Sequence, residues 1–248
     1  MFSLRGKTSL AAVALTSSVC ASASAYVGMT VDGNLVRWWE SELTFELGAT
    51  TAEEVDAAAM PDIMVDLFDQ WTAAPCGLVP EVTYAGPSTS LVSTDKASQG
   101  ANVLLFARTR AEWDATGQGR LTLAVTLVGR TPDGRIGDAD FVINDIDHKF
   151  TLADAASPGE VPLKNVMLHE AGHFFGVDHS KDNDAIMFAS FDGSHGGLTQ
   201  DDIDGICAQY TGVPEIPKKD DGGGCAGGAA SVLGLAGLAL YRRRHARA

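Results

Sequence analysis

Three histidines and one glutamate stand at a spacing that could bind a metal ion. His169 and His173 are four residues apart, so on a helix their imidazoles share one face. Glu170 lies beside that face, and Gly176 permits a sharp turn that brings His179 back as a third ligand. Three neutral imidazoles bind Zn²⁺ and leave a fourth position for water, which is typical of a catalytic site. We therefore expect a zinc centre at which Glu170 can take a proton from bound water.

Chance does not explain this pattern. In shuffled sequences of this composition, H-E-x-x-H alone is expected in roughly 0.6% of cases, and H-E-x-x-H-x-x-G-x-x-H in roughly 1 in 10⁵. Four of the six histidines fall between residues 169 and 195, and three of these fit the template. Histidines that serve only the core would not cluster in this way. His148 and His195 are interpreted as surface histidines.

The segments around the motif indicate a mixed α+β domain with three helices. Apolar residues at helical spacing predict these helices over residues 51–71, 162–175 and 199–210. The first is expected to begin at a capping box, residues 51–54, and to kink at Pro61; Thr199 caps the last. Strands are predicted over residues 36–47, 103–108, 121–128 and 136–144. No internal repeat or long linker interrupts residues 26–212, which are predicted to form one domain.

The extended histidine motif resembles that of the metzincin metallopeptidases, which also require a methionine turn after the third histidine. Met187, eight residues after His179, stands where that turn is expected. The residues between His179 and Met187 resemble the matrixin branch, and a looser resemblance extends over residues 35–212. Ala189 occupies a position that is tyrosine in the astacin-like and serralysin-like branches, which argues against both.

The resemblance implies a zincin fold: a twisted mixed sheet with an active-site helix that carries the motif. It implies that one catalytic Zn²⁺ is held by His169, His173 and His179. Glu170 is then the general base, and Met187 forms an apolar floor beneath the metal. The implied substrates are proteins or peptides.

Structural Ca²⁺ is common in that family, so acidic side chains in this sequence are candidate ligands. The oxygen donors of the right kind are Asp138, Asp140, Asp182 and Asp184. None of them forms an EF-hand-like loop, and solvated acidic loops explain these residues equally well. A structural Ca²⁺ and solvated loops therefore both stay open.

The beginning of the chain is typical of a secretory signal peptide. Residues 1–25 combine two basic residues, a short apolar run and an Ala-Ser-Ala sequence, with cleavage expected before Tyr26. A retained membrane anchor is the alternative, but the apolar run is far too short to span a bilayer. A lipoprotein signal ending at Cys20 is a further alternative, although Val19 is bulky for such a site. We therefore predict export.

The end of the chain is predicted to be a linker and a sorting tail. Residues 213–224 are polar and rich in glycine, and residues 225–248 contain an apolar stretch followed by an arginine cluster. A buried C-terminal helix is the alternative. The order of a glycine-flanked Cys225, an apolar stretch and arginines resembles the C-terminal sorting tails of myxobacterial surface proteins. That resemblance implies processing or anchoring at Cys225, with membrane contact only through the tail.

Two cysteines remain for the domain once Cys20 and Cys225 are assigned to the two ends. Cys76 and Cys207 in an oxidising compartment suggest one disulfide, although the sequence does not show that they are close. The charge balance excludes one class of partner: 18 basic against 32 acidic residues give a net charge of −14, which argues against a non-specific nucleic-acid binder. A composition with 45% hydrophobic and 20% charged residues excludes a disordered chain and a polytopic membrane protein.

These observations together predict an exported, monomeric zinc endopeptidase at the cell surface or in the medium. A non-catalytic surface adhesin or binding protein that retains the same scaffold is the alternative from another class. The presence of Glu170 argues against it, because a binding scaffold has no need of that carboxylate. A zinc hydrolase acting on a non-peptide substrate also fits the motif.

Overall fold

The computed structural model describes residues 25–48, 55–89, 100–153, 156–191, 193 and 196–211. Nearly all of the predicted signal peptide lies outside these residues, as do the linker and the tail with Cys225. The predicted capping box at residues 51–54 and His195 also lie outside them. In the described part of the chain, no helix combines the length and the apolar character needed to cross a membrane.

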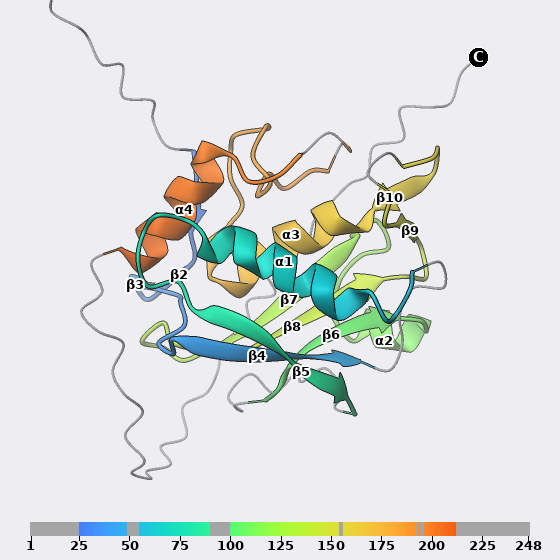
Figure 1. Cartoon of the computed structure of the whole chain (residues 1–248), viewed down its shortest axis with the longest axis horizontal. Helices are drawn as coiled ribbons and strands as arrows, with labels where there is room; N and C mark the ends of the chain where they lie inside the picture. Colours follow the sequence, from blue (N-terminus) through green and yellow to red (C-terminus); the bar gives the residue numbers. More distant parts are fainter. Residues whose placement is uncertain are drawn as a thin grey trace, which may run out of the picture.

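A five-stranded mixed sheet forms the frame of the domain (Figure 1). Its strands are β4 (Glu42–Gly48), β5 (Glu81–Ser88), β6 (Asn102–Ala107), β7 (Ala124–Arg130) and β8 (Ile136–Asn144). The order is β5-β4-β6-β8-β7, with the first four parallel and β7 antiparallel to β8 at the edge. The two edge strands thus differ in direction, and β7 is the one that lies against the active-site helix.

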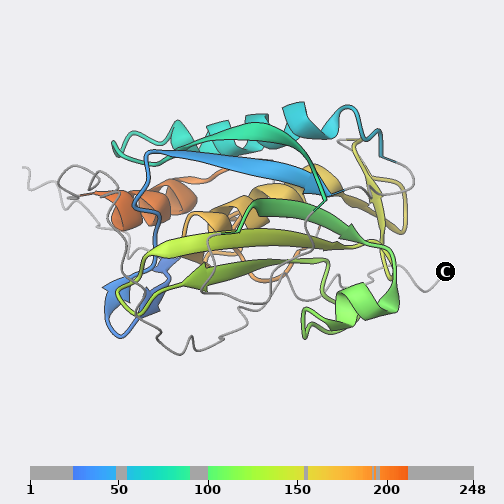
Figure 2. The ribbon, with the colours of Figure 1, turned by 90° about the horizontal axis from the view of Figure 1, so that it is seen from below.

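Two long helices cover one face of this sheet, and a short helix lies on the other side. Helices α1 (Met60–Thr72) and α3 (Leu163–Phe174) pack on each other. Figure 2 shows α1 on one side of the sheet and α2 (Arg110–Asp114) on the other. The last helix, α4 (Gln200–Tyr210), is capped by the Thr199 side chain, which accepts from the backbone N–H of Asp202. The fold is therefore the predicted mixed α+β arrangement, consistent with the zincin fold.

The alternation of side chains along β8 divides the interior into two apolar clusters. Phe141 and Ile143 belong to the main core beneath the long helices, whereas Val142 belongs to a smaller cluster with Trp113 of α2. In the main core Phe68 of α1 is surrounded by other rings, with centroids 4.9 to 5.9 Å from those of Phe45, Phe141, Phe174 and Phe175. These aromatic contacts fix α1 and α3 on the sheet.

Three two-stranded pairs complete the described elements. They are β1 (Val27–Gly28) with β11 (Val177–Asp178), β2 (Thr30–Val31) with β3 (Asn34–Leu35), and β9 (Lys149–Thr151) with β10 (Glu160–Pro162). The first pair matters most for the site, because it holds the segment directly after α3 in an extended conformation.

The structure corrects several element predictions. Helix α1 begins at Met60, so Pro61 lies in its first turn, where a fixed φ and a missing N–H are tolerated; the predicted kink is wrong. Strand β7 begins at Ala124 rather than three residues earlier. Strand β5 and helix α2 were not predicted, and with α2 the described residues contain four α-helices rather than three.

Candidate active site

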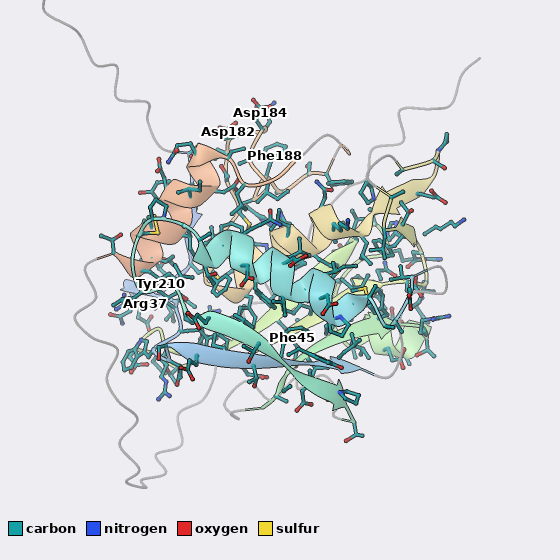
Figure 3. The ribbon with its side chains drawn as sticks, viewed as in Figure 1. Arg37, Phe45, Asp182, Asp184, Phe188 and Tyr210 are labelled. Atoms are coloured by element: carbon teal, nitrogen blue, oxygen red, sulfur yellow. A yellow bond between two sulfur atoms is a disulfide. The ribbon has the colours of Figure 1, made fainter. Side chains whose placement is uncertain are left out.

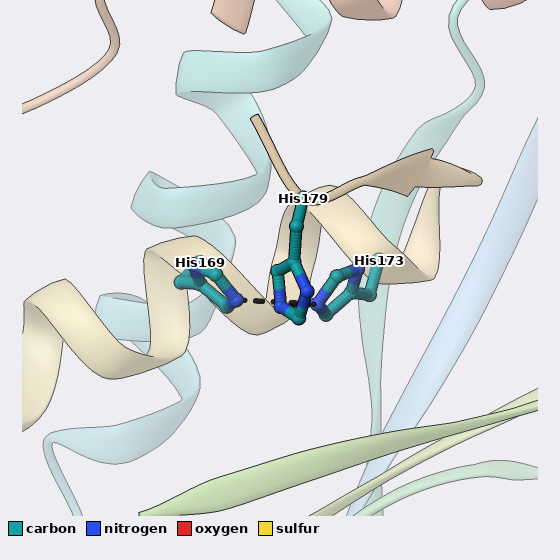
Figure 4. Close-up of side chains that lie close together, drawn as sticks. All are labelled: His169, His173 and His179. Carbon is teal, nitrogen blue, oxygen red and sulfur yellow. Dashed lines mark hydrogen bonds between the residues drawn. The ribbon is translucent and has the colours of Figure 1, made fainter. Parts of the chain in front are cut away.

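Helix α3 and the turn after it bring the three predicted histidines together. His169 and His173 lie one turn apart on α3 and are each about 1% exposed. The helix ends at Phe174, and Gly176 follows with a φ of +88°. A Cβ at Gly176 would overlap the backbone oxygen of Val36, so only glycine fits there. The reversal places His179, the residue directly after β11, against the other two imidazoles (Figure 4).

The backbone sets the orientation of two of these rings. Nδ1 of His169 lies 2.7 Å from the Ile186 carbonyl oxygen, and Nδ1 of His173 lies 2.8 Å from the Val177 carbonyl oxygen. A carbonyl oxygen can only accept, so each Nδ1 must carry the proton and donate it. In the neutral imidazole each Nε2 then keeps a lone pair, which is the state of a metal ligand.

The Nε2 atoms converge on one place, which tests whether zinc would fit. Nε2 of His173 lies 3.1 Å from that of His169 and 3.2 Å from that of His179. Two lone pairs this close repel each other unless a cation lies between them. Ligand nitrogens of a tetrahedral zinc site are roughly 3.3 Å apart, given Zn–N bonds of about 2.0–2.1 Å. The two Nε2 separations of His173 are close to that value and all three ligand atoms lie within 4.8 Å of one another, so the residues are suited to hold a zinc ion.

Electrostatics also favour neutral imidazoles here. Burial, followed by the charges of His169 and His179, lowers the pKa of His173 well below its usual range. Burial likewise lowers the pKa of His179, although Asp178 opposes that shift. Neutral imidazoles at physiological pH are ready to bind a metal without first releasing a proton.

Glu170 is fully buried next to the first histidine. Its carboxylate oxygen Oε2 lies 2.7 Å from the hydroxyl of Thr126 on β7, and the same hydroxyl is 3.0 Å from the Glu170 backbone oxygen. The sheet edge therefore contacts the predicted general base directly. No local sequence pattern indicates this contact, because 44 residues separate the two partners.

Met187 is buried against helix α3, and its role as the floor of the metal site stays a prediction. It is about 1% exposed, and a Cβ on Gly172 of α3 would overlap its sulfur atom, so the two are packed as closely as glycine allows. Its backbone oxygen accepts from the N–H of Ser180, 2.8 Å away, which joins the turn to the residue after His179. Figure 3 shows Phe188, the next residue, on the same loop.

Asp202 holds this methionine turn in place, a role that the sequence reasoning missed. Its carboxylate accepts from the backbone N–H groups of Ile186 and Met187, at 2.9 and 3.0 Å. It also accepts from the backbone N–H and the hydroxyl of Thr199, both at 2.8 Å. The available signal was that Asp202 is the fourth residue of the predicted helix cap, but this position indicated only the start of a helix.

The neighbouring Asp201 joins Ala25 and Tyr26 to the residue after His179. Its Oδ1 accepts from the backbone N–H groups of Ala25 and Tyr26, at 2.8 and 3.0 Å. Its Oδ2 accepts from the hydroxyl of Ser180 at 2.6 Å. Consecutive aspartates at the start of α4 therefore fix both sides of the loop that carries His179.

A disulfide joins Cys76 to Cys207, with 5.0 Å between the two Cα atoms. It ties the segment after α1 to α4 and lies among the residues drawn in Figure 3.

The four candidate calcium ligands do not form one group. Asp138 and Asp140 lie on β8 and are each about 1% exposed, whereas Asp182 and Asp184 belong to an exposed turn in which Asp182 Oδ1 accepts from the Asp184 N–H at 3.0 Å (Figure 3). Among the described residues, the only cluster of three or more metal-binding side chains is the histidine cluster. His148 lies elsewhere, with its Nε2 3.1 Å from the Arg120 carbonyl oxygen.

Comparison with known proteins agrees with this geometry. Residues 37–211 match the Matrixin family. Matrix metalloproteinase-27 of Tupaia belangeri is 48% identical over 60 residues, which is 23% of this chain and 12% of that protein. Metalloendoproteinase 5-MMP of Arabidopsis thaliana is 37% identical over 90 residues, or 36% of this chain and 23% of that protein. A probable matrix metalloproteinase, 095L, of Invertebrate iridescent virus 3 is 22% identical over 180 residues, or 73% and 44%. The chain thus spans less than half of the length of each of these relatives.

Proposed function

Because the chain belongs to the matrixin family, we propose that it is a zinc-dependent endopeptidase that hydrolyses peptide bonds in proteins or peptides. The observation that carries the proposal is the convergence of three histidine ring nitrogens beside a buried glutamate. A structural histidine cluster would not need both Nδ1 protons turned away toward backbone oxygens.

Each residue of the site has one role in the proposed reaction. His169, His173 and His179 hold the zinc ion, and Met187 packs beneath them. Bound zinc would supply a Lewis acid that activates a water molecule and polarises the carbonyl group to be attacked. The Glu170 carboxylate accepts the proton of that water and passes it to the leaving amine. Burial of Glu170 keeps bulk water from competing for this proton transfer.

The proposal for the whole chain includes its two ends. Export by the signal peptide of residues 1–25 would deliver a domain of residues 26–212 to an oxidising compartment, and the Cys76–Cys207 bridge suits that environment. The linker of residues 213–224 and the tail of residues 225–248 would then place a monomeric enzyme at the cell surface through processing at Cys225.

We propose separately that Asp138 and Asp140 bind a structural Ca²⁺. Asp138 and Asp140 point to the same face of β8, as residues two apart on a strand do. Two buried carboxyl groups supply hard oxygen ligands, which Ca²⁺ prefers.

One experiment tests the proposed activity. The wild-type protein, Glu170→Gln and the control Glu81→Gln, which alters an exposed residue at the start of β5, are purified and their zinc content is measured. Each is then incubated with a library of fluorogenic peptides. We expect one zinc per chain in all three proteins, full cleavage by the control, and a loss of about 10²–10⁴-fold in kcat for Glu170→Gln, since general acid–base catalysis contributes that much.

A chelator should abolish the wild-type cleavage, and added Zn²⁺ should restore it. A wild-type protein that binds zinc but cleaves no peptide left intact by Glu170→Gln would contradict the enzyme proposal and favour a binding protein.

A further inference from the structure

Thr126 is the residue of the sheet edge that contacts Glu170. Its side chain is about 2% exposed, and its hydroxyl lies 2.7 Å from Glu170 Oε2. Strand β7 pairs with β8 on one side, and among the described residues no strand pairs with its other side. Thr126 therefore belongs to the one strand that forms both the edge of the sheet and a wall beside the active-site helix.

Side-chain alternation along β7 makes a hydroxyl at this position informative. Ala124 and Val128, two residues away on either side, belong to the main apolar core, while Val125 and Leu127 face the smaller cluster. A polar residue in such a row costs free energy unless it is hydrogen-bonded. Valine has nearly the same shape and is at least as favourable in a strand. Packing alone therefore gives no reason for threonine here.

The hydroxyl has a single proton, and its two neighbours compete for it. The Glu170 backbone oxygen is 3.0 Å away, and the carboxylate oxygen is closer. An ionised carboxylate is the stronger acceptor, and a distance of 2.7 Å is typical of a charge-assisted O–H···O⁻ bond. The proton therefore goes to Oε2.

We propose that Thr126 is a positioning residue that holds Oε2 of Glu170 and so directs Oε1 toward the water molecule that attacks the peptide bond. This inference rests on the proposed function. A glutamate side chain has three rotatable bonds, and fixing one carboxylate oxygen restricts the carboxylate to the orientation that proton transfer needs. Thr126 itself touches neither the substrate nor the metal ligands in this role.

The test compares a variant that loses only the hydroxyl with one that keeps it. Thr126→Val preserves the shape, and Thr126→Ser preserves the hydroxyl. We expect Thr126→Val to bind a full equivalent of zinc and to lose about 10- to 100-fold in kcat, the factor that corresponds to one hydrogen bond to a charged group, with KM changed less than about twofold. Thr126→Ser should stay within about threefold of the wild-type kcat.

Two results would overturn the inference while leaving the proposed function intact. One is a wild-type kcat in Thr126→Val, and the other is an equal loss in Thr126→Ser and Thr126→Val, which would assign the effect to packing. If Thr126→Val does not fold, Thr126→Ala and Thr126→Ser, which differ only by the hydroxyl, replace that comparison.

A readout that does not depend on activity separates this inference from the proposed function. Crystal structures of the zinc-loaded wild type and Thr126→Val show where the Glu170 carboxylate lies. We expect one position bonded to Thr126 in the wild type and a shifted or multiple position in the variant. An unchanged carboxylate in the variant overturns the inference even if no substrate is found. Failure of the wild type to cleave anything, with the carboxylate shifted as expected, would count against the enzyme proposal alone.

Discussion

Asp202 and Asp138 are two equally buried aspartates, each about 1% exposed, in very different surroundings. Asp202, at the start of α4, accepts four hydrogen bonds from the methionine turn and from Thr199. Asp138, on β8, has a second carboxyl group nearby in Asp140, and its Oδ1 accepts no hydrogen bond from the described residues. Burial, followed by the charge of Asp140, raises the pKa of Asp138 to about 7.

The difference shows that hydrogen-bond donors, rather than depth, decide what a buried carboxyl group does. Donors around Asp202 let a charged group tie together two segments of the active site. Because it lacks such donors among the described residues, Asp138 either is protonated or binds a cation. The methionine turn is therefore held by a carboxylate with satisfied hydrogen bonds, whereas the Asp138–Asp140 pair makes stability sensitive to pH.

The largest expected effect comes from removing the satisfied carboxylate. Asp202→Ala leaves the N–H groups of Ile186 and Met187 without acceptors, so we expect a loss of about 3–5 kcal/mol in the free energy of unfolding. Zinc affinity should fall as well, because the Ile186 carbonyl orients His169. Urea denaturation and zinc titration measure both.

Asp204→Ala is the matched control, since Asp204 lies on the same helix and, within the described part of the chain, accepts only an exposed hydrogen bond from Gln200. It should change the free energy of unfolding by less than about 0.5 kcal/mol. Equal losses in the two variants would mean that the contacts of Asp202 have no special weight.

A smaller effect, a gain rather than a loss in stability at high pH, is expected from substituting Asp138. Its pKa of about 7 in the folded protein exceeds the unfolded value of 3.8, so the folded state binds the extra proton between these values. The stabilising contribution is complete below pH 4 and is lost as the pH rises through 7. The quantity to compare is the difference in free energy of unfolding between Asp138→Asn and the wild type. This difference should shift in favour of the variant by about 2 kcal/mol from pH 4 to pH 8, after allowance for solvent screening.

Urea denaturation of both proteins in calcium-free buffer at pH 4, 6 and 8 measures this double difference, which cancels the titration of other groups. A constant difference across the three pH values would show that Asp138 is already ionised in the folded protein.

The smallest expected effect is that of calcium on the same pair. If Asp138 and Asp140 bind Ca²⁺ as proposed, a concentration of ten times Kd stabilises the wild type by about 1.4 kcal/mol, or a rise of roughly 3–5 °C in Tm. The rise should be larger at pH 8 than at pH 5, because protons compete for Asp138, and Asp140→Asn should abolish it. No change in Tm with up to 10 mM Ca²⁺ would mean that the carboxyl pair binds a proton rather than Ca²⁺. This result would contradict the calcium proposal.

Local patterns in the sequence were enough to predict the helix with His169 and His173, the turn at Gly176 and the bounds of β8. Each depends on residues close together in the chain. Strand β5 was missed because Gly86 and Pro87 interrupt its pattern, which an edge strand tolerates. Helix α2 has five residues, too few to show a helical period.

The contacts that complete the site could not be predicted in the same way. Thr126 reaches Glu170 across 44 residues, and the side chain of Asp202 reaches back 16 residues to Ile186. Such pairs depend on how β7 and α4 pack against α3, which no single-sequence pattern encodes. The histidine cluster was therefore predictable, whereas the long-range contacts of Thr126 and Asp202 were not.

If the protein cleaves peptide bonds as proposed, the Cys76–Cys207 bridge has a consequence for a molecule exposed to its own activity. The two cysteines are 131 residues apart, and all three histidines of the cluster lie between them. A single cut of the backbone anywhere in that interval leaves two fragments that are still one covalent molecule. A self-inflicted nick would thus remain invisible on a denaturing gel until a thiol is added, and the severed parts of the domain could not diffuse away from each other.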